Sequence, residues 1–569
     1  MFILSIFIAA LLSTVSVTIT EPVDGETYNG DWLTIRAIVE NENEIPEYVQ
    51  YTLNGQTAVD ISRLNTDWYT YMQNDLHHGF SESPAPEDNT VFWTAPITGT
   101  GHEFPTPVVV DGLVYYPQNF DGDTLFALDA ATGDVEWIFT GIGSTDDAVT
   151  VKDGKLYIAS DSIYCLDALT GARIWATGAG NWEGSTPVMV DNRVYCGCHN
   201  GSYASIIFCL DSSNGEVLWD TELSGSTVSC MTCWNNTLFV PTYGCMSTPG
   251  KLYALDADDG SIEWEKEASS CLGYWDSSPT IVDGVIYIGD CDSYIRAIDA
   301  CSGETIWEYY LSGGPSYDSI TATPAYASGS IYVGTDYHCF ASLSSDIGAL
   351  NWEVDGTIHG SPAVADGIVF FGEFYPVSGS VSVIALSCSS GSTIWTYQTT
   401  ADYLHGSPSI TDGIVYIPVE DGYLYAFGTG LKYTYRDDFF AEVGSNELIV
   451  TSFDEGVPAA ADTINFTVTE TGISLEPTHR LGLCASPNPF HSSASISFEL
   501  SEPGWTCVTV YELSGRMIRT LENSELGVGQ HSIVWDGRRE NGEAVSAGLY
   551  LCKIQSGEIS ETIGLCLLR

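Results

Sequence analysis

Tryptophan recurs along the middle of this chain at a spacing that few folds can use. Seven Trp residues follow one another at intervals of 38, 44, 45, 43, 45 and 43 positions, and an eighth stands 44 positions before the first of them. Each closes a unit of apolar segments separated by Asp-Gly and by Leu-Asp-Ala-x-Thr-Gly or a degenerate copy of it. A period of about 40–45 residues with four strands per unit is typical of a β-propeller blade. The eight anchors are Trp93, Trp137, Trp175, Trp219, Trp264, Trp307, Trp352 and Trp395.

The residues that recur at the same position in each repeat have physical roles. Asp-Gly pairs such as Asp111-Gly112 predict tight hairpins between the first and second strands. Asp followed by Gly four residues later predicts the turn between the third and fourth strands, because Gly adopts a positive φ at little cost. The periodic Trp is expected to fill the wedge between neighbouring blades, which widens outward. We therefore interpret these Trp residues as core, and not as the walls of a cofactor site.

The number of blades follows from an incomplete unit. The last unit offers three strands, the third of them Leu424–Phe427, and lacks a strand that ends in Trp. The segment Thr90–Trp93 stands before the first full unit and offers the missing strand. We predict that the two pair, which closes a ring of eight blades without an open sheet edge.

Charge and hydropathy restrict the partners and the compartment. The chain has 75 Asp and Glu against 18 Lys and Arg, a formal net charge of -57, which disfavours nucleic acid and anionic lipid as partners. The apolar run Phe2–Leu12 is too short to span a bilayer and predicts a secretory signal over residues 1–16. No later stretch is apolar enough to span a membrane, and no Cys precedes Cys165, so a lipid-modified cysteine is not expected. We predict an extracellular or outer-surface protein.

The sixteen cysteines allow two interpretations. Twelve lie from Cys165 to Cys388 and four in the tail, and even numbers in both parts fit disulfides in an oxidising compartment. The alternative is that several are small buried hydrophobic residues on strands. Cys230 and Cys233 are followed by Trp234, which excludes covalent haem attachment, and a single Cys-x-x-Cys pair is a weak zinc signal.

The segments that flank the propeller predict an all-β chain of several domains. Residues 17–63 alternate apolar and polar side chains but are short for a sandwich, and residues 429–472 read like its second half. We expect one Ig-like domain into which the propeller, residues 64–428, is inserted, since ring closure places both propeller ends in one blade. A linker over 473–483 leads to a C-terminal β-sandwich over 484–569.

Two resemblances follow from these motifs. The Leu-Asp-Ala-x-Thr-Gly…Trp unit resembles the repeat of the PQQ-like propeller superfamily, and Trp68–Ser81 is similar to the lead-in before such repeats. That superfamily includes quinoprotein alcohol dehydrogenases, a lipoprotein that assists outer-membrane protein assembly, and many secreted proteins. The tail, with Pro487–Phe490 and Ala547–Tyr550, resembles the Ig-like domain of the flagellar hook-capping protein and the sorting domains of type IX secretion cargo. This second resemblance implies secretion machinery as a partner, or else a plain structural module.

The resemblance to quinoproteins implies that the residues of their cofactor site can be looked for in this sequence. Those enzymes carry adjacent cysteines beside PQQ and carboxylates on Ca²⁺, whereas here Gly197 separates Cys196 from Cys198. The blades are also minimal and leave little inserted loop for a closed pocket. We therefore expect no cofactor, no metal and no catalytic residue.

One set of positions is a candidate binding site. The residue seven places before the Asp of each Asp-Gly turn is expected near the mouth of the central channel, where Asp146, Asp276, His359 and His405 would converge. The alternative is that they are the ordinary polar lining of a channel mouth. The leading hypothesis is a non-enzymatic scaffold whose propeller face binds a protein or glycan; the alternatives are a PQQ- and Ca²⁺-dependent oxidoreductase and an envelope protein-assembly factor.

Overall fold

The computed structural model divides into two compact units, Met1–Thr469 and Glu470–Arg569. Every element in its described ranges is a β-strand, and none of the described residues belongs to a helix long and apolar enough to cross a membrane. The predicted signal falls outside the described residues. These are 16–567 except 24–26, 30–31, 41–47, 55, 57, 98–104, 119–122, 144, 146, 179–182, 200–203, 228, 246, 271, 312–317, 375–380, 441–443, 455–456, 470–483, 487–493, 501–503, 513–516, 540–544, 546–547 and 557–558.

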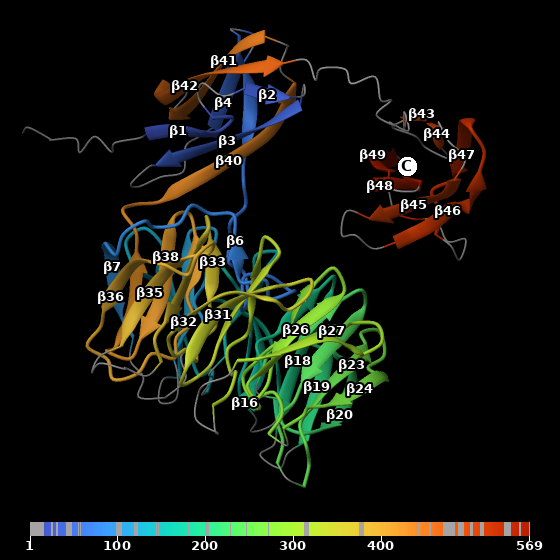
Figure 1. Ribbon diagram of the computed structural model, residues 1–569. Helices are drawn as coiled ribbons and strands as arrows, with labels where there is room; N and C mark the ends of the chain where they lie inside the picture. Colours follow the sequence, from blue (N-terminus) through green and yellow to red (C-terminus); the bar gives the residue numbers. More distant parts are fainter. Residues whose placement is uncertain are drawn as a thin grey trace, which may run out of the picture. The chain divides into compact units, whose positions relative to one another are not determined.

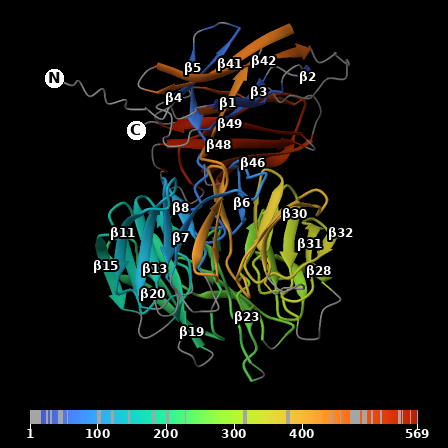
Figure 2. The same ribbon diagram turned by 90° about the vertical axis from the view of Figure 1, so that its left-hand side faces the viewer.

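Eight antiparallel sheets stand around a common axis in the first unit and form the blades of a propeller (Figures 1 and 2). Blade 1 contains β8 (Val108–Val110), β9 (Leu113–Pro117), β10 (Thr124–Asp129) and β11 (Val135–Thr140), and blade 2 contains β12 (Thr150–Lys152), β13 (Lys155–Ala159), β14 (Ser162–Asp167) and β15 (Arg173–Gly178). Blade 3 contains β17 (Val188–Val190), β18 (Arg193–His199), β19 (Ala204–Asp211) and β20 (Val217–Ser224), with β16 (Glu183–Gly184) beside β18. Blade 4 contains β21 (Thr232–Trp234), β22 (Thr237–Pro241), β23 (Lys251–Asp256) and β24 (Ile262–Glu267).

The remaining blades follow the same order of strands from the axis outward. Blade 5 contains β25 (Thr280–Val282), β26 (Val285–Gly289), β27 (Tyr294–Asp299) and β28 (Thr305–Tyr310), and blade 6 contains β29 (Ala325–Ala327), β30 (Ser330–Gly334), β31 (Cys339–Ser344) and β32 (Leu350–Asp355). Blade 7 contains β33 (Ala363–Ala365), β34 (Ile368–Gly372), β35 (Ser382–Ser387) and β36 (Thr393–Gln398), with β6 (Phe80–Ser81) beside β33. Blade 8 contains β37 (Ser409–Thr411), β38 (Ile414–Val419), β39 (Tyr423–Phe427) and β7 (Val91–Pro96).

The eighth blade confirms the predicted closure of the ring. Its outermost strand, β7, comes from before the first blade and pairs antiparallel with β39, with Trp93 opposite Ala426. The ring is therefore shut by strand pairing between distant parts of the chain. The fold class, an all-β propeller of eight blades with Ig-like sandwich segments, is as the sequence predicts.

Each anchor tryptophan joins its blade to the next one. The indole N–H donates to a backbone carbonyl at 2.8–3.1 Å. In seven blades the acceptor is the second residue of the next blade's turn between third and fourth strands, which begins with Asp in five cases and with Ser344 or Ser387 in the other two, whereas Trp395 reaches Pro86. The ring lies on the Gly of that turn, where a Cβ would come within 2.5–3.0 Å of it. Trp93, Trp175 and Trp395 are buried, but the other five are only half-buried because the fourth strand is the outermost.

The cysteines of the propeller favour the second interpretation. Eleven of the thirteen cysteines whose side chains the structure describes are in the propeller; all eleven are free thiols, and seven of them are buried. Cys165 and Cys209 lie on the third strands of their blades, directly opposite Trp175 and Trp219, at the position where five other blades have Ala and one has Ser. A small side chain is required there because the indole fills the space. These two cysteines therefore act as small apolar core residues.

Strands from both sides of the propeller share one eight-stranded sheet that folds over on itself. β3 pairs with β40 over nine residue pairs, and β4 pairs with β41 over six. The arrangement is what insertion of the propeller into one domain requires, and we call it the split domain. In sheet order the strands are β1 (Ser16–Glu21), β3 (Trp32–Glu40), β40 (Lys432–Phe440), β5 (Val59–Arg63), β4 (Tyr48–Leu53), β41 (Gly444–Asp454), β42 (Val457–Thr469) and β2 (Thr27–Asn29).

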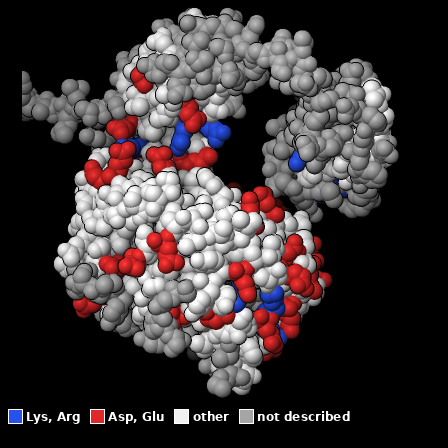
Figure 3. All heavy atoms as spheres, in the orientation of Figure 1, with Lys and Arg blue, Asp and Glu red and all other residues white. Residues whose placement is uncertain are grey.

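The split domain is continuous with the eighth blade. Its buried side chains, such as Ile35 and Val450, belong to the same hydrophobic cluster as Tyr416 and Leu424 of the propeller. Arg63 forms an ion pair of 2.7 Å with Asp412, which is in the Asp-Gly turn of that blade. Figure 3 shows Lys and Arg beside Asp and Glu at this junction, while carboxylates outnumber cations over the visible propeller surface.

The second unit is a separate sandwich. A three-stranded and a four-stranded sheet enclose a core that includes Phe498, Val510 and the fully buried Trp535. Its strands are β43 (Cys484–Ser486), β44 (Ala494–Leu500), β47 (Gly529–Trp535), β46 (Met517–Leu526), β45 (Gly504–Glu512), β48 (Gly548–Ser556) and β49 (Ile559–Leu567).

The contact between indole and glycine is testable with a matched pair of substitutions. Gly171 and Gly154 have φ values of +68° and +72°, but a Cβ at Gly171 would lie 2.6 Å from the ring of Trp137, whereas one at Gly154 meets nothing within 4 Å. We expect Gly154→Ala to cost about 1–2 kcal/mol through backbone strain alone. Gly171→Ala should cost about 1–3 kcal/mol more through overpacking. Thermal unfolding of both variants measures the difference, and equal losses would contradict the wedge.

Candidate functional site

The two faces of the propeller differ in the connections they carry. One face holds the Asp-Gly and Asp-x-x-x-Gly turns, and the split domain attaches to it through Asp412. The other holds the loops between second and third strands and the connections from each blade to the next. We call them the turn face and the loop face. Insertions that build a site would have to lie on the loop face, because the turns are too short.

A segment before the first blade closes the channel towards the turn face. This strap, residues 64–83, forms backbone hydrogen bonds with the innermost strands of blades 1, 2, 5, 6 and 7, each at the residue two places before the turn. His77 Nδ1 lies 2.9 Å from Thr232 Oγ1 in blade 4, and Ser83 accepts from Gly413 in blade 8. Trp68, Met72 and His77 are buried by at least 99%. Burial lowers the pKa of His77 to about 3, so its imidazole is neutral.

A ring of hydroxyls links the blades just beyond the strap. In five blades, the residue five places before the turn between the first and second strands donates its backbone N–H to a Ser or Thr hydroxyl. That hydroxyl belongs to the equivalent residue of the next blade, and the distances are 2.8–3.1 Å. Tyr71 of the strap reaches this ring, since its hydroxyl lies 2.7 Å from Ser361 Oγ and donates to Thr323 Oγ1 at 3.0 Å. Tyr71 therefore extends from the strap into the channel as far as this ring of hydroxyls. The hydroxyls that accept are those of Thr186, Ser278, Thr323, Ser361 and Ser407.

Two of the four predicted site residues lie side by side at the loop face. The rings of His359 and His405 have centroids 5.0 Å apart. His405 Nδ1 forms a short contact with Glu420 Oε1, and its backbone N–H donates to the same oxygen at 3.1 Å. Burial, with the charge of His405, lowers the pKa of His359 to about 3. Glu420 comes from the loop between the second and third strands of blade 8, and sequence spacing did not single it out.

The two predicted aspartates have different outcomes. Asp146 lies outside the described residues. Asp276 is at the loop face, in blade 5, and its charge contributes to the raised pKa values of Tyr71 and Cys291. Convergence of all four residues on one point stays a prediction.

Aromatic rings gather around the two histidines. Phe374 contacts His359 and His405, with centroid distances of 4.9 and 4.8 Å, and also approaches Tyr337 and Tyr403 at 5.9 and 6.1 Å. Tyr337 is 41% exposed and Tyr403 is 39% exposed. This aromatic cluster spans three consecutive blades. Periodicity did not reveal it, because its members lie in loops and not at repeat positions.

A second exposed ring lies on the same face. Trp275, 44% exposed, stacks on Tyr243 with centroids 5.5 Å apart and planes 24° apart. Buried carboxylates lie between the two groups of rings: burial, then the charge of Asp318, raises the pKa of Asp336 to about 7, and Thr321 donates to its carboxylate. The loop face thus combines exposed aromatic surface with partly protonated acids.

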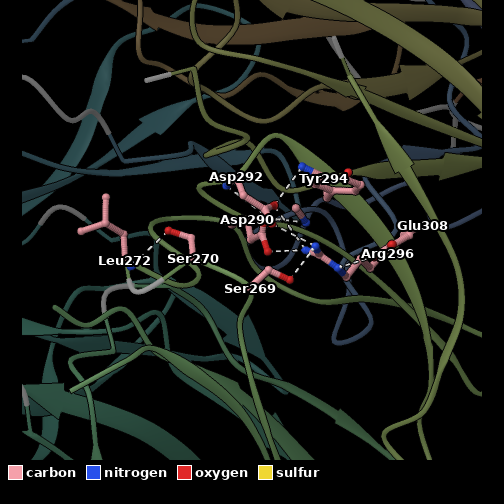
Figure 4. A network of polar contacts seen from close by, with 10 residues as sticks. Ser269, Ser270, Leu272, Asp290, Asp292, Tyr294, Arg296 and Glu308 are labelled. Atoms are coloured by element: carbon pink, nitrogen blue, oxygen red, sulfur yellow. Dashed lines mark hydrogen bonds and ion pairs between the residues drawn. The ribbon is translucent and has the colours of Figure 1, made fainter. Parts of the chain in front are cut away.

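A buried arginine fixes the loops that carry Trp275 and Asp276 (Figure 4). Arg296 on β27 forms ion pairs with three carboxylates, including a short one to the fully buried Asp290. Its Nη2 also donates to Ser269 Oγ, in the connection from blade 4, at 2.9 Å. The guanidinium is only 6% exposed, so its charge is used within the protein and is not offered to a ligand. The three carboxylates belong to Asp290, Asp292 and Glu308.

The structure does not fit PQQ at the channel. The cofactor is a flat tricarboxylate, but the strap lies across the axis towards the turn face. The described residues of the loop face include the buried carboxylates Asp318 and Asp336, whereas the cations Arg296 and Lys251 are already paired with carboxylates. Cys196 and Cys198 lie on β18 in the hydrophobic wedge between blades 2 and 3, together with Trp175. They are therefore inside the sheet packing and not beside the axis. We derive no reaction step through this cofactor.

Repeat, ring closure and channel define an eight-bladed propeller of the PQQ-like type. A family model described as outer membrane protein assembly factor BamB matches residues 159–373 and 291–434. A second, described as the FlgD Ig-like domain, matches residues 487–558. The chain thus carries a BamB-like repeat domain followed by an FlgD-type Ig-like domain.

Known proteins similar to the chain have different functions. BamB of Yersinia pestis is 26% identical over 251 residues, which cover 41% of this chain and 61% of the relative. Tetrathionate hydrolase of Acidithiobacillus ferrooxidans is 24% identical over 368 residues, 50% of this chain and 70% of the relative. Polyvinylalcohol dehydrogenase of a Sphingopyxis species is 24% identical over 235 residues, 32% and 36%. The chain spans 61% and 66% of the first two BamB relatives, and its relatives include enzymes and an assembly factor.

Solved structures show the same fold. Quinohemoprotein alcohol dehydrogenase from Comamonas testosteroni has a TM-score of 0.51 at 16% identity, over 66% of this chain and 81% of that one. A europium-containing methanol dehydrogenase has a TM-score of 0.50 at 13% identity, over 66% and 98%. At this level of identity the likeness establishes the propeller and nothing about a reaction.

The Arg296 network should matter far more for stability than an exposed ion pair. Arg296→Met would leave Asp290 buried without its cation, which costs about 3–5 kcal/mol in comparable sites. Arg193→Met is the matched control, because its ion pair with Asp258 is exposed and worth under about 1 kcal/mol. Denaturant unfolding of both variants tests this. A loss in Arg296→Met no larger than in the control would refute the assignment.

Proposed function

We propose that this protein is a non-enzymatic binding propeller whose loop face takes up a protein or glycan partner outside the cytoplasm. The observation that carries the proposal is the set of exposed rings on that face, Trp275, Tyr337 and Tyr403, each supported from beneath or beside by a second aromatic ring. Rings held in place in this way lose little conformational entropy when a partner covers them, and aromatic residues dominate binding hot spots.

The candidate site supports binding more than catalysis. His359 and His405 are near one another, but the pair is backed by Glu420 and Phe374, and burial keeps His359 neutral. The described loop face offers no exposed cation to a substrate anion, because Arg296 is already paired with three carboxylates. A neutral or cationic partner surface therefore suits this face better than an anionic one, in agreement with the net charge of -57.

The terminal segments support an extracytoplasmic location within this proposal. The apolar run of the first twelve residues suits a secretory signal, and the FlgD-type tail suits attachment or sorting at the cell surface. We propose that the tail engages secretion machinery and the propeller engages the partner. The tail is a compact unit by itself, which suits such a division of roles.

An envelope protein-assembly factor is the second candidate. The specific observation in its favour is the match of the repeat to BamB, whose printed description is an outer membrane assembly factor. Such a protein would use the same loop face to bind another protein. Recovery of the native chain in the medium, and not in the periplasm, would favour the secreted scaffold.

Truncation of the exposed rings should weaken binding without unfolding the propeller. A triple Trp275→Ala, Tyr337→Ala, Tyr403→Ala variant of the full chain is immobilised and probed with surface-fraction proteins and with a panel of soluble polysaccharides. We expect affinity to fall at least about tenfold, as for hot-spot aromatics. The control is a Leu169→Ala, Ile347→Ala variant, because these exposed apolar side chains, 75% and 71% exposed, lie in turns on the opposite face. Equal binding by the triple variant and the wild type would rule out this face.

The oxidoreductase alternative makes a distinct prediction. If PQQ were the cofactor, incubation of the chain with PQQ and Ca²⁺ followed by desalting would leave stoichiometric cofactor absorbance on the protein. We expect none to remain, because the strap occupies the channel and the loop face is acidic. Retention of one PQQ per chain would overturn the proposed function.

A further inference from the structure

Three metal-ligating side chains of different kinds meet in blade 6, away from the aromatic cluster's histidines. His338 ends the loop between β30 and β31, Cys339 is the first residue of β31, and Glu353 is on β32. One nitrogen, one sulfur and one oxygen from these residues all lie within 4.8 Å of one another. Across the ranges that the structure describes, no other group of three His, Cys, Asp or Glu residues does so.

The local fold explains why the three converge. Cys339 pairs with Asp355 across the two strands, and side chains two apart on a strand share a face, so Glu353 is the diagonal neighbour of Cys339. The backbone N–H groups of His338 and Cys339 both donate to Thr335 Oγ1, at 3.1 and 3.2 Å. These two hydrogen bonds bend the loop. The side chains of His338 and Cys339, which would point to opposite faces in a regular strand, therefore lie on the same side as Glu353.

The donor set has the chemistry of a zinc site. Thiolate, imidazole and carboxylate are the three ligand types of Zn²⁺, and three protein ligands with one open position is a common arrangement. Cys339 is buried, His338 is half-buried and Glu353 is exposed, so an ion can enter from solvent on the Glu353 side. Ligand atoms around a tetrahedral ion with bonds of about 2.0–2.3 Å stand about 3.5 Å apart. The flexible, exposed Glu353 side chain can close the remaining gap.

A neighbouring carboxylate gives an independent sign that a cation is missing. Asp318 is only 5% exposed, and its Oδ1 accepts from the backbone N–H of Tyr337, one residue before His338, at 3.0 Å. Its Oδ2 is buried and makes no well-formed hydrogen bond to the described residues; burial raises the pKa of this carboxyl, and the nearby Thr335 hydroxyl offsets that rise in part. A buried carboxylate oxygen without a donor is costly, and such a group in a native structure calls for an explanation. A divalent ion beside this loop would compensate its charge.

We propose that His338, Cys339 and Glu353 bind a zinc-class divalent ion in blade 6, with Asp318 as a nearby second carboxylate. The site is separate from the proposed binding of a partner and does not depend on it. An ion held there would fix the loop 335–339, which carries the exposed Tyr337. The site would thus stabilise one edge of the loop face.

Cobalt substitution tests the assignment. The full chain is stripped with a chelator and titrated with Co²⁺, which gives a cysteinate-to-metal charge-transfer band in the near ultraviolet when a thiolate coordinates it. We expect one equivalent to bind, Zn²⁺ to displace it, and the band to vanish in Cys339→Ala. Cys301→Ala is the control, because Cys301 is an exposed thiol in a turn of blade 5, and it should keep the band.

A second variant keeps the test decisive if Cys339→Ala does not fold. Glu353→Gln changes an exposed side chain and should leave the thermal midpoint of the metal-free protein unchanged. It should weaken Co²⁺ binding at least about tenfold, because removal of a residue that only supports a ligand already costs about 10–100-fold in metal affinity, and removal of a ligand itself should cost no less. Zn²⁺ should raise the midpoint of the wild type more than that of this variant. The proposal fails if the wild type shows no band, if the band survives in Cys339→Ala or is lost in Cys301→Ala, or if Glu353→Gln binds as the wild type does.

Discussion

The indole that reaches from the outer strand of one blade to the turn of the next is the contact on which this molecule depends. Radially arranged sheets diverge outward, so neighbouring blades need a large side chain between them and a fixed point to hold it. Here the fixed point has two parts, a glycine that lets the ring lie on the backbone and a carbonyl that accepts the indole N–H. Each such hydrogen bond contributes about 1 kcal/mol to stability. Because the contact repeats around the ring, these contributions add up between every pair of neighbouring blades.

The loop face is built on this frame by a second set of contacts near the axis. In five blades a hydrogen bond to a hydroxyl ties the start of the innermost strand to the next blade, and the strap lies across the channel behind these bonds. With the axis occupied, a partner has access to the rim but not to the interior. The strands follow the plan of the solved quinoprotein propellers, and here the strap crosses the axis towards the turn face.

Much of the fold was readable because its signals are local and repeated. The Trp period, the Asp-Gly turns and the missing strand of the last blade predicted eight blades and the pairing of the Trp93 strand with Leu424–Phe427. The hydroxyl ring left a signal that was overlooked, since six of the eight blades have Ser-Pro or Thr-Pro at that position, as in Ser361-Pro362. The resemblance of Trp68–Ser81 to a lead-in did not indicate that this segment crosses the channel, and the pair of His405 with Glu420 left no signal, because both join non-repeated segments whose proximity depends on the closed ring. The half-burial of most anchor Trp residues was likewise not predicted, because periodicity does not reveal which strand is outermost.

The connection of the propeller to the split domain has a mechanical consequence. The chain enters and leaves the propeller beside the same blade, and β3 and β40, from before and after it, are direct neighbours over nine residue pairs. A pull between the N-terminal segment and a tail tethered elsewhere would reach these strands at Trp32 and Phe440, which lie opposite each other, and would open their hydrogen bonds one after another from that end. The propeller would carry none of that tension until they broke. A protein anchored at one end in a moving medium would thus keep its blades, and whatever they hold, isolated from drag.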